Sequence, residues 1–484
     1  MLARTVTHAL VGLDPRRVEV EAHLQRGAPT FAIVGLADRA CHEAKHRVRS
    51  GIASAELEWP QRRITVNLAP ADLRKEGPGF DLPIALAVLG ASGQLPRERL
   101  EGHAAIGELA LDGRLRPVPG ALAAAEGARR AGIERIVCAV ESGAEIALSG
   151  IRPVAVRHLV DAVRYFKGEH DPPEPEAALP ATERPPPDLA DVRGQERARR
   201  ALEIAAAGAH NLLLIGPPGI GKTMLARRLP GILPPLDDDE AFEVTRIHSI
   251  AGLLAPGSGL LRMPPFRAPH HSVSTAAVVG GGSTPRPGEV TLAHRGVLLL
   301  DELPEFPRAV LEALRQPLED GTVSVARVGG RALFPARFQL VATMNLCPCG
   351  ARGDPAALCD CTPAQLDRYR SRLSRALLDR VDLVLVLPRP RATELAAFPG
   401  ESSSLVQRRV ADARGRAQSH SQLESAAADL LARAVERLPL SGRGRARVVR
   451  VSRTIAALAA AEAVGPEHVA EALSYRSPPE LQLA

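Results

Sequence analysis

The sequence of 484 residues predicts an α/β protein whose last part is entirely helical. Three observations lead to this prediction. A short apolar run, residues 211–215, is followed by a glycine-rich turn and then by a helical pattern. A second apolar run, residues 296–300, ends in two adjacent acids. From about residue 402 onwards, apolar residues recur at helical spacing and strand patterns cease.

Composition narrows the protein class. Apolar residues make up 45% of the chain, which is sufficient for sizeable cores. No apolar run reaches the roughly 18–20 residues of a membrane helix, and the first residues lack a signal-peptide core. We therefore expect a soluble cytoplasmic protein without membrane contact. The net charge of +6 favours an anionic partner, but nearly all of the positive charge is arginine, which we attribute to genome-wide composition.

Residues 216–223 have the spacing of a phosphate-binding loop between a strand and a helix. Backbone N–H groups of such a turn and the N-terminus of the following helix attract phosphate oxygens. We expect Lys222 to reach the β- and γ-phosphates and Thr223 to ligate Mg²⁺. The predicted nucleotide-binding residues of this loop are Gly216, Pro217, Pro218, Gly219, Ile220, Gly221, Lys222 and Thr223.

The acids that end the second apolar run are Asp301 and Glu302. After a phosphate loop, such a pair predicts that Asp301 holds Mg²⁺ and that Glu302 is the general base for the attacking water. Alone, it would indicate only a turn at a strand end. The segment between Lys222 and Asp301 is longer than one helix and one strand require. It contains His270 and His271, for which structural loop histidines are the favoured interpretation and metal ligands the alternative.

Residues 1–167 predict a mixed α+β domain, because strand and helix patterns alternate along them. The expected strands are 16–22, 62–70 and 136–140, the last of them closing the domain; the expected helices are 80–89 and 120–131; residues 107–114 form a hairpin-like pair.

Two stretches of this domain, residues 75–81 and 113–120, resemble the nucleophile turn and the lysine-bearing segment of the Lon-family proteolytic domain. Gly79 stands where that family has its serine, and Leu122 stands near the position of its lysine. Without a hydroxyl and an adjacent amine, Ser-Lys acyl transfer is impossible. The resemblance implies a Lon-protease-like fold with the protease site absent, used for assembly or binding.

Residues 168–187 are rich in proline and acidic residues and predict a semi-extended linker. A proline-motif ligand is the alternative. The linker divides the N-terminal domain from a nucleotide-binding core at 188–395 and a C-terminal helical lid at 396–484.

The core resembles AAA+ ATPases in three places. The segment before the helix that ends near Gly208 matches their adenine pocket and nominates Val192, Gly194 and Gln195. Asn345, after the strand 338–344, matches sensor 1, which orients the attacking water. Arg380 matches the finger that points at the γ-phosphate of the neighbouring subunit; an ion pair with Asp382 is the alternative.

The long insertion resembles that of the helix-2-insert clade, which includes magnesium chelatases and MCM-like helicases. A helix at 313–321 precedes a hairpin whose turn is Gly329-Gly330. In a ring, this hairpin would point into the pore, where Arg327 and Arg331 would contact DNA phosphates. Solvated hairpin arginines are the alternative.

The lid is expected to contain helices from about 406, at 426–438, at 447–463, and from Pro466 to about 475. Arg443 is the first candidate for sensor 2, with Arg450 and Arg453 behind it.

Four cysteines interrupt the core between residues 347 and 361. Two close pairs across a short loop can form a tetrahedral zinc site; a redox pair and free thiols remain alternatives. The predicted ligands are Cys347, Cys349, Cys359 and Cys361. Cys41 and Cys138 are isolated and expected to be buried.

Along essentially its whole length the chain is similar to the YifB/ComM family of magnesium-chelatase-like AAA+ ATPases, as residues 64–72, 266–271 and 299–306 indicate. The resemblance implies ATP and Mg²⁺ as cofactors, a homohexameric ring and DNA as partner. It further implies helicase activity in branch migration during natural transformation. The alternatives are a magnesium-chelatase motor subunit and a remodelling or scaffold ATPase.

Overall fold

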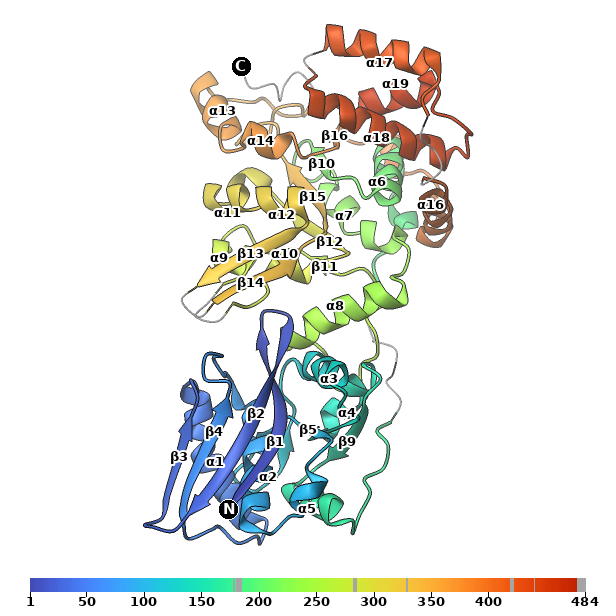
Figure 1. Ribbon diagram of the computed structural model, residues 1–484. Helices are drawn as coiled ribbons and strands as arrows, with labels where there is room; N and C mark the ends of the chain where they lie inside the picture. The colour runs from blue at the N-terminus through green and yellow to red at the C-terminus, as the bar shows by residue number, and fades with distance from the viewer. Residues whose placement is uncertain are drawn as a thin grey trace.

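A computed structural model describes residues 1–176, 179, 185–281, 285–327, 330–417, 422–438 and 440–476, with backbone only at 326–327, 330–331 and 417. Two bodies follow one another along the molecule, and the helical C-terminal part lies at the end away from the N-terminus (Figure 1). Across these residues, no helix combines the length and apolarity needed to cross a bilayer.

The N-terminal body is a seven-stranded mixed sheet in the order β3-β4-β2-β1-β5-β8-β9. A long antiparallel hairpin forms its centre, and the strands on the β5 side run parallel to β1. The strands are β1 (Leu2–Val11), β2 (Asp14–Gln25), β3 (Thr30–Val34), β4 (Arg63–Ala69), β5 (His103–Ala105), β8 (Arg135–Ala139) and β9 (Arg152–Val156). The helices are α1 (Arg39–Ser54), α2 (Asp81–Ser92), α3 (Ala121–Arg130), α4 (Val140–Ala147) and α5 (Leu159–Lys167).

The predicted strands 16–22, 62–70 and 136–140 and both predicted helices are confirmed as β2, β4, β8, α2 and α3. The expectation that 136–140 is the last strand is wrong, because β9 pairs with β8 beyond it. Pro153 and the exposed Arg152 obscure the apolar alternation of β9, as is common at a sheet edge. The hairpin at 107–114 shrinks to two residues on each side, β6 (Glu108–Leu109) and β7 (Leu115–Arg116).

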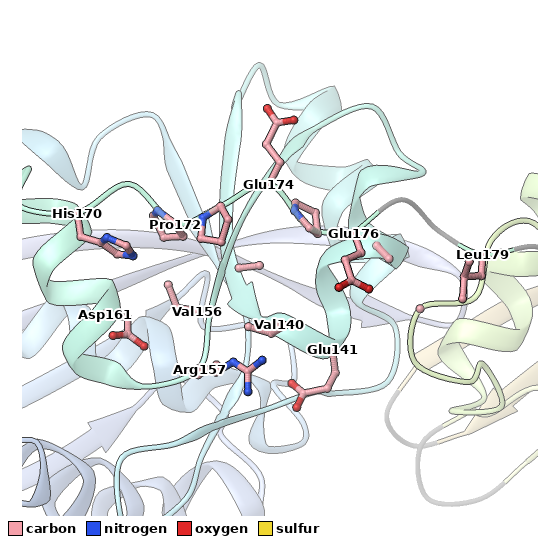
Figure 2. Close-up of a pocket in the computed structure, with 15 residues that line it drawn as sticks. Val140, Glu141, Val156, Arg157, Asp161, His170, Pro172, Glu174, Glu176 and Leu179 are labelled. Atoms are coloured by element: carbon pink, nitrogen blue, oxygen red, sulfur yellow. The ribbon is translucent and has the colours of Figure 1, made fainter.

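The linker begins by running back along this body. Its prolines Pro172 and Pro175 line a cavity of about 550 Å³ together with Val140 of α4 and Val156 of β9 (Figure 2). Leu179 then joins the second body: its N–H donates to Gly257 O at 2.9 Å, and its carbonyl accepts from Gly259 N at 2.7 Å. The described part of the linker contains no helix, as expected of a semi-extended spacer; residues 177–178 and 180–184 lie outside the described residues.

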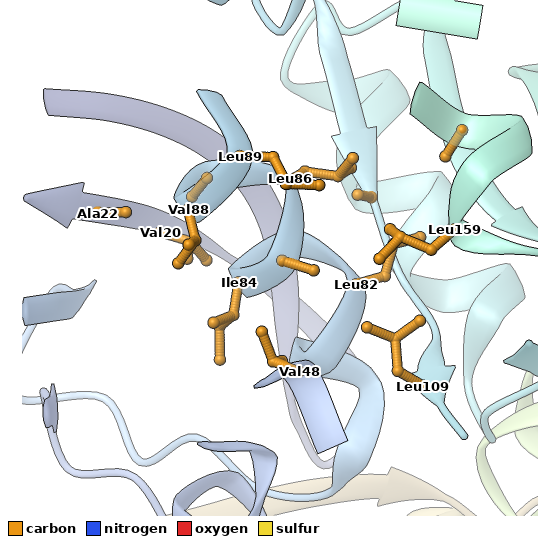
Figure 3. Close-up of a cluster of buried hydrophobic side chains, with 14 of the residues drawn as sticks. Val20, Ala22, Val48, Leu82, Ile84, Leu86, Val88, Leu89, Leu109 and Leu159 are labelled. Carbon is orange, nitrogen blue, oxygen red and sulfur yellow. The ribbon is translucent and has the colours of Figure 1, made fainter. Parts of the chain in front are cut away.

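Helix α2 is the centre of the N-terminal core. All its residues from Asp81 to Ala91 are buried, because it packs against the β1–β2 hairpin on one side and α1 on another (Figure 3). Burying one leucine or isoleucine in this way contributes about 1.5–3 kcal/mol. The nearby Gly79, where the Lon family has its serine, faces apolar groups: a Cβ there would lie 3.5 Å from both Ile106 and Val118. Leu122 is fully buried.

The second body is built on a five-stranded parallel sheet in the order β11-β12-β15-β10-β16. Its central strands are completely buried, as expected for a parallel sheet covered on both faces. The strands are β10 (Leu212–Ile215), β11 (Phe266–Arg267), β12 (Val297–Leu300), β15 (Gln339–Met344) and β16 (Leu383–Val386), and β13 (Thr322–Arg327) pairs separately with β14 (Gly330–Pro335). The helices are α6 (Glu196–Gly208), α7 (Lys222–Ala226), α8 (Asp238–Ile250), α9 (Thr275–Val279), α10 (Glu289–Leu292), α11 (Arg308–Ala313), α12 (Arg315–Asp320), α13 (Pro363–Arg370), α14 (Arg375–Leu378) and α15 (Ala392–Leu395).

Two helix predictions in this part need correction. The helix expected at 313–321 is divided into α11 and α12, because Pro317 has no N–H to donate to the carbonyl of Ala313. The third lid helix begins at Gly442 rather than Arg447, since the Ser441 hydroxyl caps it by accepting from Gly444 N at 3.1 Å. The lid helices are α16 (Ser403–Ala417), α17 (Ser425–Arg437), α18 (Gly442–Leu458) and α19 (Pro466–Ser474).

The two bodies are joined by the β1–β2 hairpin and by α3, which lies against α8 (Figure 1). Leu13, at the hairpin tip, is 8% exposed and belongs to the apolar core beneath β13 and β14. From α8, Arg246 donates to the buried Glu126 at 2.7 Å, and the Ser249 carbonyl accepts from Gly120 N at 3.0 Å. A shared apolar core and a partly buried ion pair therefore fix the N-terminal body to the second one.

Candidate nucleotide site

The predicted nucleotide-binding residues meet where the parallel strands end, at their carboxyl ends. Gly216 follows β10, Asp301 follows β12 and Asn345 follows β15, and these three strands are neighbours. The carboxyl ends of parallel strands form the usual ligand-binding edge of an α/β sheet. Three separate sequence motifs are thus brought together by strand order.

Lys222 lies inside the phosphate loop. Its Nζ donates to the carbonyls of Gly216 at 2.7 Å and Pro217 at 2.8 Å and to Asn345 Oδ1 at 2.9 Å. Burial lowers the pKa of Lys222, and the nearby Asp301 carboxylate opposes that shift. The loop needs glycine at 219 and 221, where φ is +76° and +93°. The geometry holds a cation where terminal phosphates would lie.

Asp301 is held by two hydroxyl groups. Thr223 Oγ1 lies 3.0 Å from each of its carboxylate oxygens, and Thr343 Oγ1 donates to Asp301 Oδ1 at 2.5 Å. Thr223 and Asp301 are therefore adjacent, as a shared Mg²⁺ requires. Sequence reasoning missed Thr343; its signal was a hydroxyl two residues before Asn345, following the apolar run 340–342.

Glu302 is exposed and has φ of +55°, a left-handed conformation that is uncommon for a non-glycine residue. Its N–H donates to Thr343 Oγ1 at 3.1 Å. One buried threonine thus orients both acids: it donates to the carboxylate of Asp301 and accepts from the backbone of Glu302. Strained backbone of this kind concentrates at functional sites.

The segment before α6 also reaches the loop. Val192 is fully buried, and Gly194 and Gln195 have φ of +60° and +51°. Gln195 Nε2 donates to Ile220 O at 2.8 Å, while its buried Oε1 accepts no hydrogen bond from the described residues. An unused acceptor beside the phosphate loop fits an amino group such as that of adenine.

Arg380 lies at the amino ends of the parallel strands, on the opposite side of the sheet from the phosphate loop, because it precedes β16. Its side chain is 8% exposed, donates to Ala376 O at 2.6 Å, and forms an ion pair with Glu319. Its Nε has no acceptor among the described residues. The alternative pairing of Arg380 with Asp382 is wrong: that carboxylate accepts from Asn211 N at 2.9 Å and pairs with lid arginines.

The lid arginines gather at the same edge as Arg380. Arg443 is 68% exposed and lies 3.8 Å from Glu319, and Arg450 pairs with Asp382. A cavity of about 340 Å³ lies among four arginines, two of them from α18 and two from segments that precede β15 and β16. They are Arg337, Arg380, Arg447 and Arg450.

The four predicted cysteine ligands converge, with all their sulfur atoms within 4.8 Å of one another. Cys347 Sγ accepts from Arg352 N at 3.2 Å. The backbone N–H of Ala351 lowers the pKa of Cys349 to about 7, whereas burial raises the pKa of Cys347. Four thiolates at this spacing fit a tetrahedral zinc ion. Cys41 and Cys138 are buried and unpaired with other cysteines, as predicted.

Two further predictions can be placed. The rings of His270 and His271 stack at 4.0 Å, and these residues belong to no cluster of three metal-ligating groups in the described part of the chain. Strands β13 and β14 pair antiparallel, as expected for the predicted hairpin. Residues 328–329 and the side chains of Arg327 and Arg331 lie outside the described residues.

Comparison with known proteins gives three family matches: "Magnesium chelatase, subunit ChlI" over residues 188–395, "Subunit ChlI of Mg-chelatase" over 20–142, and "Magnesium chelatase, subunit ChlI C-terminal" over 416–476. The YifB protein of Salmonella typhimurium is 44% identical over 98% of this chain and 97% of its own length. The competence protein ComM of Haemophilus influenzae is 41% identical, with the same two coverages. Lon protease 2 of Bacillus subtilis is 29% identical over 28% of this chain and 26% of its own.

Proposed function

Because the chain belongs to the YifB/ComM family of magnesium-chelatase-like proteins, we propose that it is a cytoplasmic AAA+ ATP hydrolase that forms a homohexameric ring and couples hydrolysis to movement on DNA. The observation that carries the ATPase proposal is the convergence of Lys222, Asp301, Glu302 and Asn345 at one sheet edge.

In this proposal each side chain has one task. Lys222 and the loop N–H groups bind the terminal phosphates, and Asn345, already hydrogen-bonded to Lys222, positions the attacking water. Thr223 and Asp301 would hold Mg²⁺, which neutralises the charge developing on the phosphates. The exposed Glu302 accepts the proton of the attacking water.

Nucleotide and metal selectivity follow from the neighbouring residues. Val192, Gly194 and Gln195 contact the adenine, for which the unused Gln195 Oε1 is a suitable acceptor. The four cysteines would hold a zinc ion, which would serve as a structural cross-link of this loop rather than in catalysis.

Arg380 completes the ATP site of the next subunit. It lies at the sheet edge opposite its own phosphate loop, so it cannot act on its own nucleotide without rearrangement. A head-to-tail ring brings this edge against the ATP site of a neighbour. Arg443, which lies 3.8 Å from Glu319 of the Arg380–Glu319 pair, is our candidate for sensor 2.

DNA as the substrate is supported by the name of the competence relative. The antiparallel hairpin β13–β14 is the element that we propose for contact with DNA in the ring pore. We propose branch migration of incoming strands during natural transformation as the process. A magnesium-chelatase motor subunit is the second candidate, which the family matches favour. The cysteine cluster argues against it, because such motors are not expected to carry one.

The test is ATP hydrolysis by the purified chain with and without single-stranded or forked DNA. Stimulation by DNA is the expected result, and absence of both binding and stimulation would remove the DNA proposal. Glu302→Gln should retain ATP and stop turnover. The matched control is Glu305→Gln, a half-exposed acid of the same segment that pairs with Arg372, which should hydrolyse ATP normally.

A further inference from the structure

The cysteine cluster lies directly against the ATP site. The loop that carries it leaves the sheet immediately after Asn345, and its Gly350 packs on Pro218 of the phosphate loop. A Cβ at Gly350 would lie 2.7 Å from Pro218 Cγ, 3.0 Å from Pro218 Cδ and 3.9 Å from Asn345 Nδ2. At this position there is therefore no room for a side chain between the two loops unless one of them moves.

The same loop is also tied to the other side of the site. Asp354 pairs with Arg389 at 3.1 Å, just beyond β16. Leu387 in that segment crowds the start of the phosphate loop, since a Cβ at Gly216 would lie 2.5 Å from Leu387 O. The cysteine loop thus contacts the phosphate loop directly and the segment that supports it through an ion pair.

Residues 346–362 contain no helix or strand and little buried apolar surface. Of the four cysteines only Cys347 is buried, whereas Cys349 and Cys359 are exposed. A segment of this kind cannot fix its own conformation by packing and needs a cross-link or a metal. The four converging sulfur atoms supply the metal ligands, and Gly350 lies between the first pair and the second.

We propose that a zinc ion in the cysteine cluster is a structural part of the ATP site: by fixing Gly350 against Pro218 and beside Asn345, it sets the geometry of the phosphate loop. This inference rests on the proposed ATPase function. Zinc loss would free the loop, displace Asn345 from Lys222, and lower turnover although every residue that touches ATP is still present. Gly350 and Pro218 act as positioning residues, because they transmit the constraint without contacting the reacting atoms.

Two glycines of the loop give a matched pair of variants. Gly350 and Gly353 have φ of +81° and +83°, so alanine strains the backbone equally at both. At Gly350 the added methyl meets the Pro218 ring, whereas at Gly353 it meets the flexible end of Leu346 at 2.8 Å. Both variants keep all four thiols.

Gly350→Ala should lower kcat/KM for ATP by about 10- to 100-fold, the effect of a misplacement near 1 Å, with zinc content unchanged. Gly353→Ala should remain within about threefold of the wild type. Zinc content by elemental analysis and affinity for a fluorescent ATP analogue are measured beside turnover. Equal activity of the two variants would overturn the coupling.

Metal removal tests the same idea on the unmodified chain. A strong chelator should remove one zinc per chain. The rate of ATP hydrolysis should fall in proportion to the zinc removed, and added zinc should restore it. Hydrolysis that is unaffected by loss of the metal, or a chain that binds no zinc, overturns the inference. A wild-type chain that binds zinc but hydrolyses no ATP would instead contradict the proposed ATPase function.

Discussion

Replacing Thr343 with valine tests how the two acids of the site are held. The side chain is 1% exposed, and valine has nearly the same shape, so the change removes two hydrogen bonds without leaving a cavity. One bond, to the Asp301 carboxylate at 2.5 Å, involves a charge and is worth about 1.5–3 kcal/mol. The other, from Glu302 N at 3.1 Å, is worth about 1 kcal/mol.

Together these bonds amount to about 3 kcal/mol, which corresponds to roughly a 100-fold change in rate if all of it is expressed in the transition state. Thr343→Val should therefore lower kcat by about 10- to 100-fold. ATP affinity should fall less, because Lys222 and the loop are untouched. Thr343→Ser, which keeps the hydroxyl, is the control and should remain within about threefold of the wild type.

The assay is steady-state ATP hydrolysis with kcat and KM determined separately, together with thermal unfolding to show that the variant is folded. A Thr343→Val enzyme with wild-type kcat would refute the reasoning that this hydroxyl positions Glu302. A loss of activity as large in Thr343→Ser would show that packing, not hydrogen bonding, is responsible.

Three other predictions follow. Arg380→Ala and Lys222→Ala chains should each be inactive alone. In an equal mixture that assembles at random, about a quarter of the interfaces combine an intact phosphate loop with an intact Arg380, so hydrolysis should partly return. No recovery would contradict action in trans. Burial lowers the pKa of His210 to about 4. As the pH falls, the histidine is protonated in the unfolded chain before it is protonated in the folded one. The free energy of unfolding should therefore be about 2 kcal/mol lower at pH 5 than above pH 6.5. His210→Asn should not show this decrease in thermal unfolding. Leu13→Ala should destabilise the chain by about 2 kcal/mol in denaturant, whereas the exposed Leu36→Ala should not; equal midpoints would show that the hairpin tip contributes no packing.

The sequence was most informative where a motif is local. The phosphate loop, Asp301 and Asn345 each stand at the end of an apolar run, and a strand end can be recognised without knowledge of the strand's neighbours. The helix α6 and the four cysteines are predictable for the same reason, because the spacing of their residues contains the whole signal.

The residues that sequence reasoning missed depend on contacts between distant strands. Thr343 acquires its role because β15 lies beside β12 in a register that places its hydroxyl between the two acids. The partner of Arg380 proved to be Glu319, 61 residues away, rather than the adjacent Asp382. Leu13 stands at the tip of a hairpin, and nothing near it in the chain indicates that it enters the core of another body. Register and docking are set by packing of whole elements, which no short pattern records.

The position of the phosphate loop and of Arg380 at opposite edges of one sheet has a consequence for assembly. Under the proposed head-to-tail association, each contact between subunits makes one complete ATP site. A row of subunits that remains open therefore has one complete site fewer than it has subunits: its first member has a loop without a finger, and its last a finger without a loop. Closing the row completes the missing site, so the nucleotide bound there would itself stabilise the closed state. Opening, for instance to admit a strand of DNA, would then be easiest at whichever contact has just lost its phosphate.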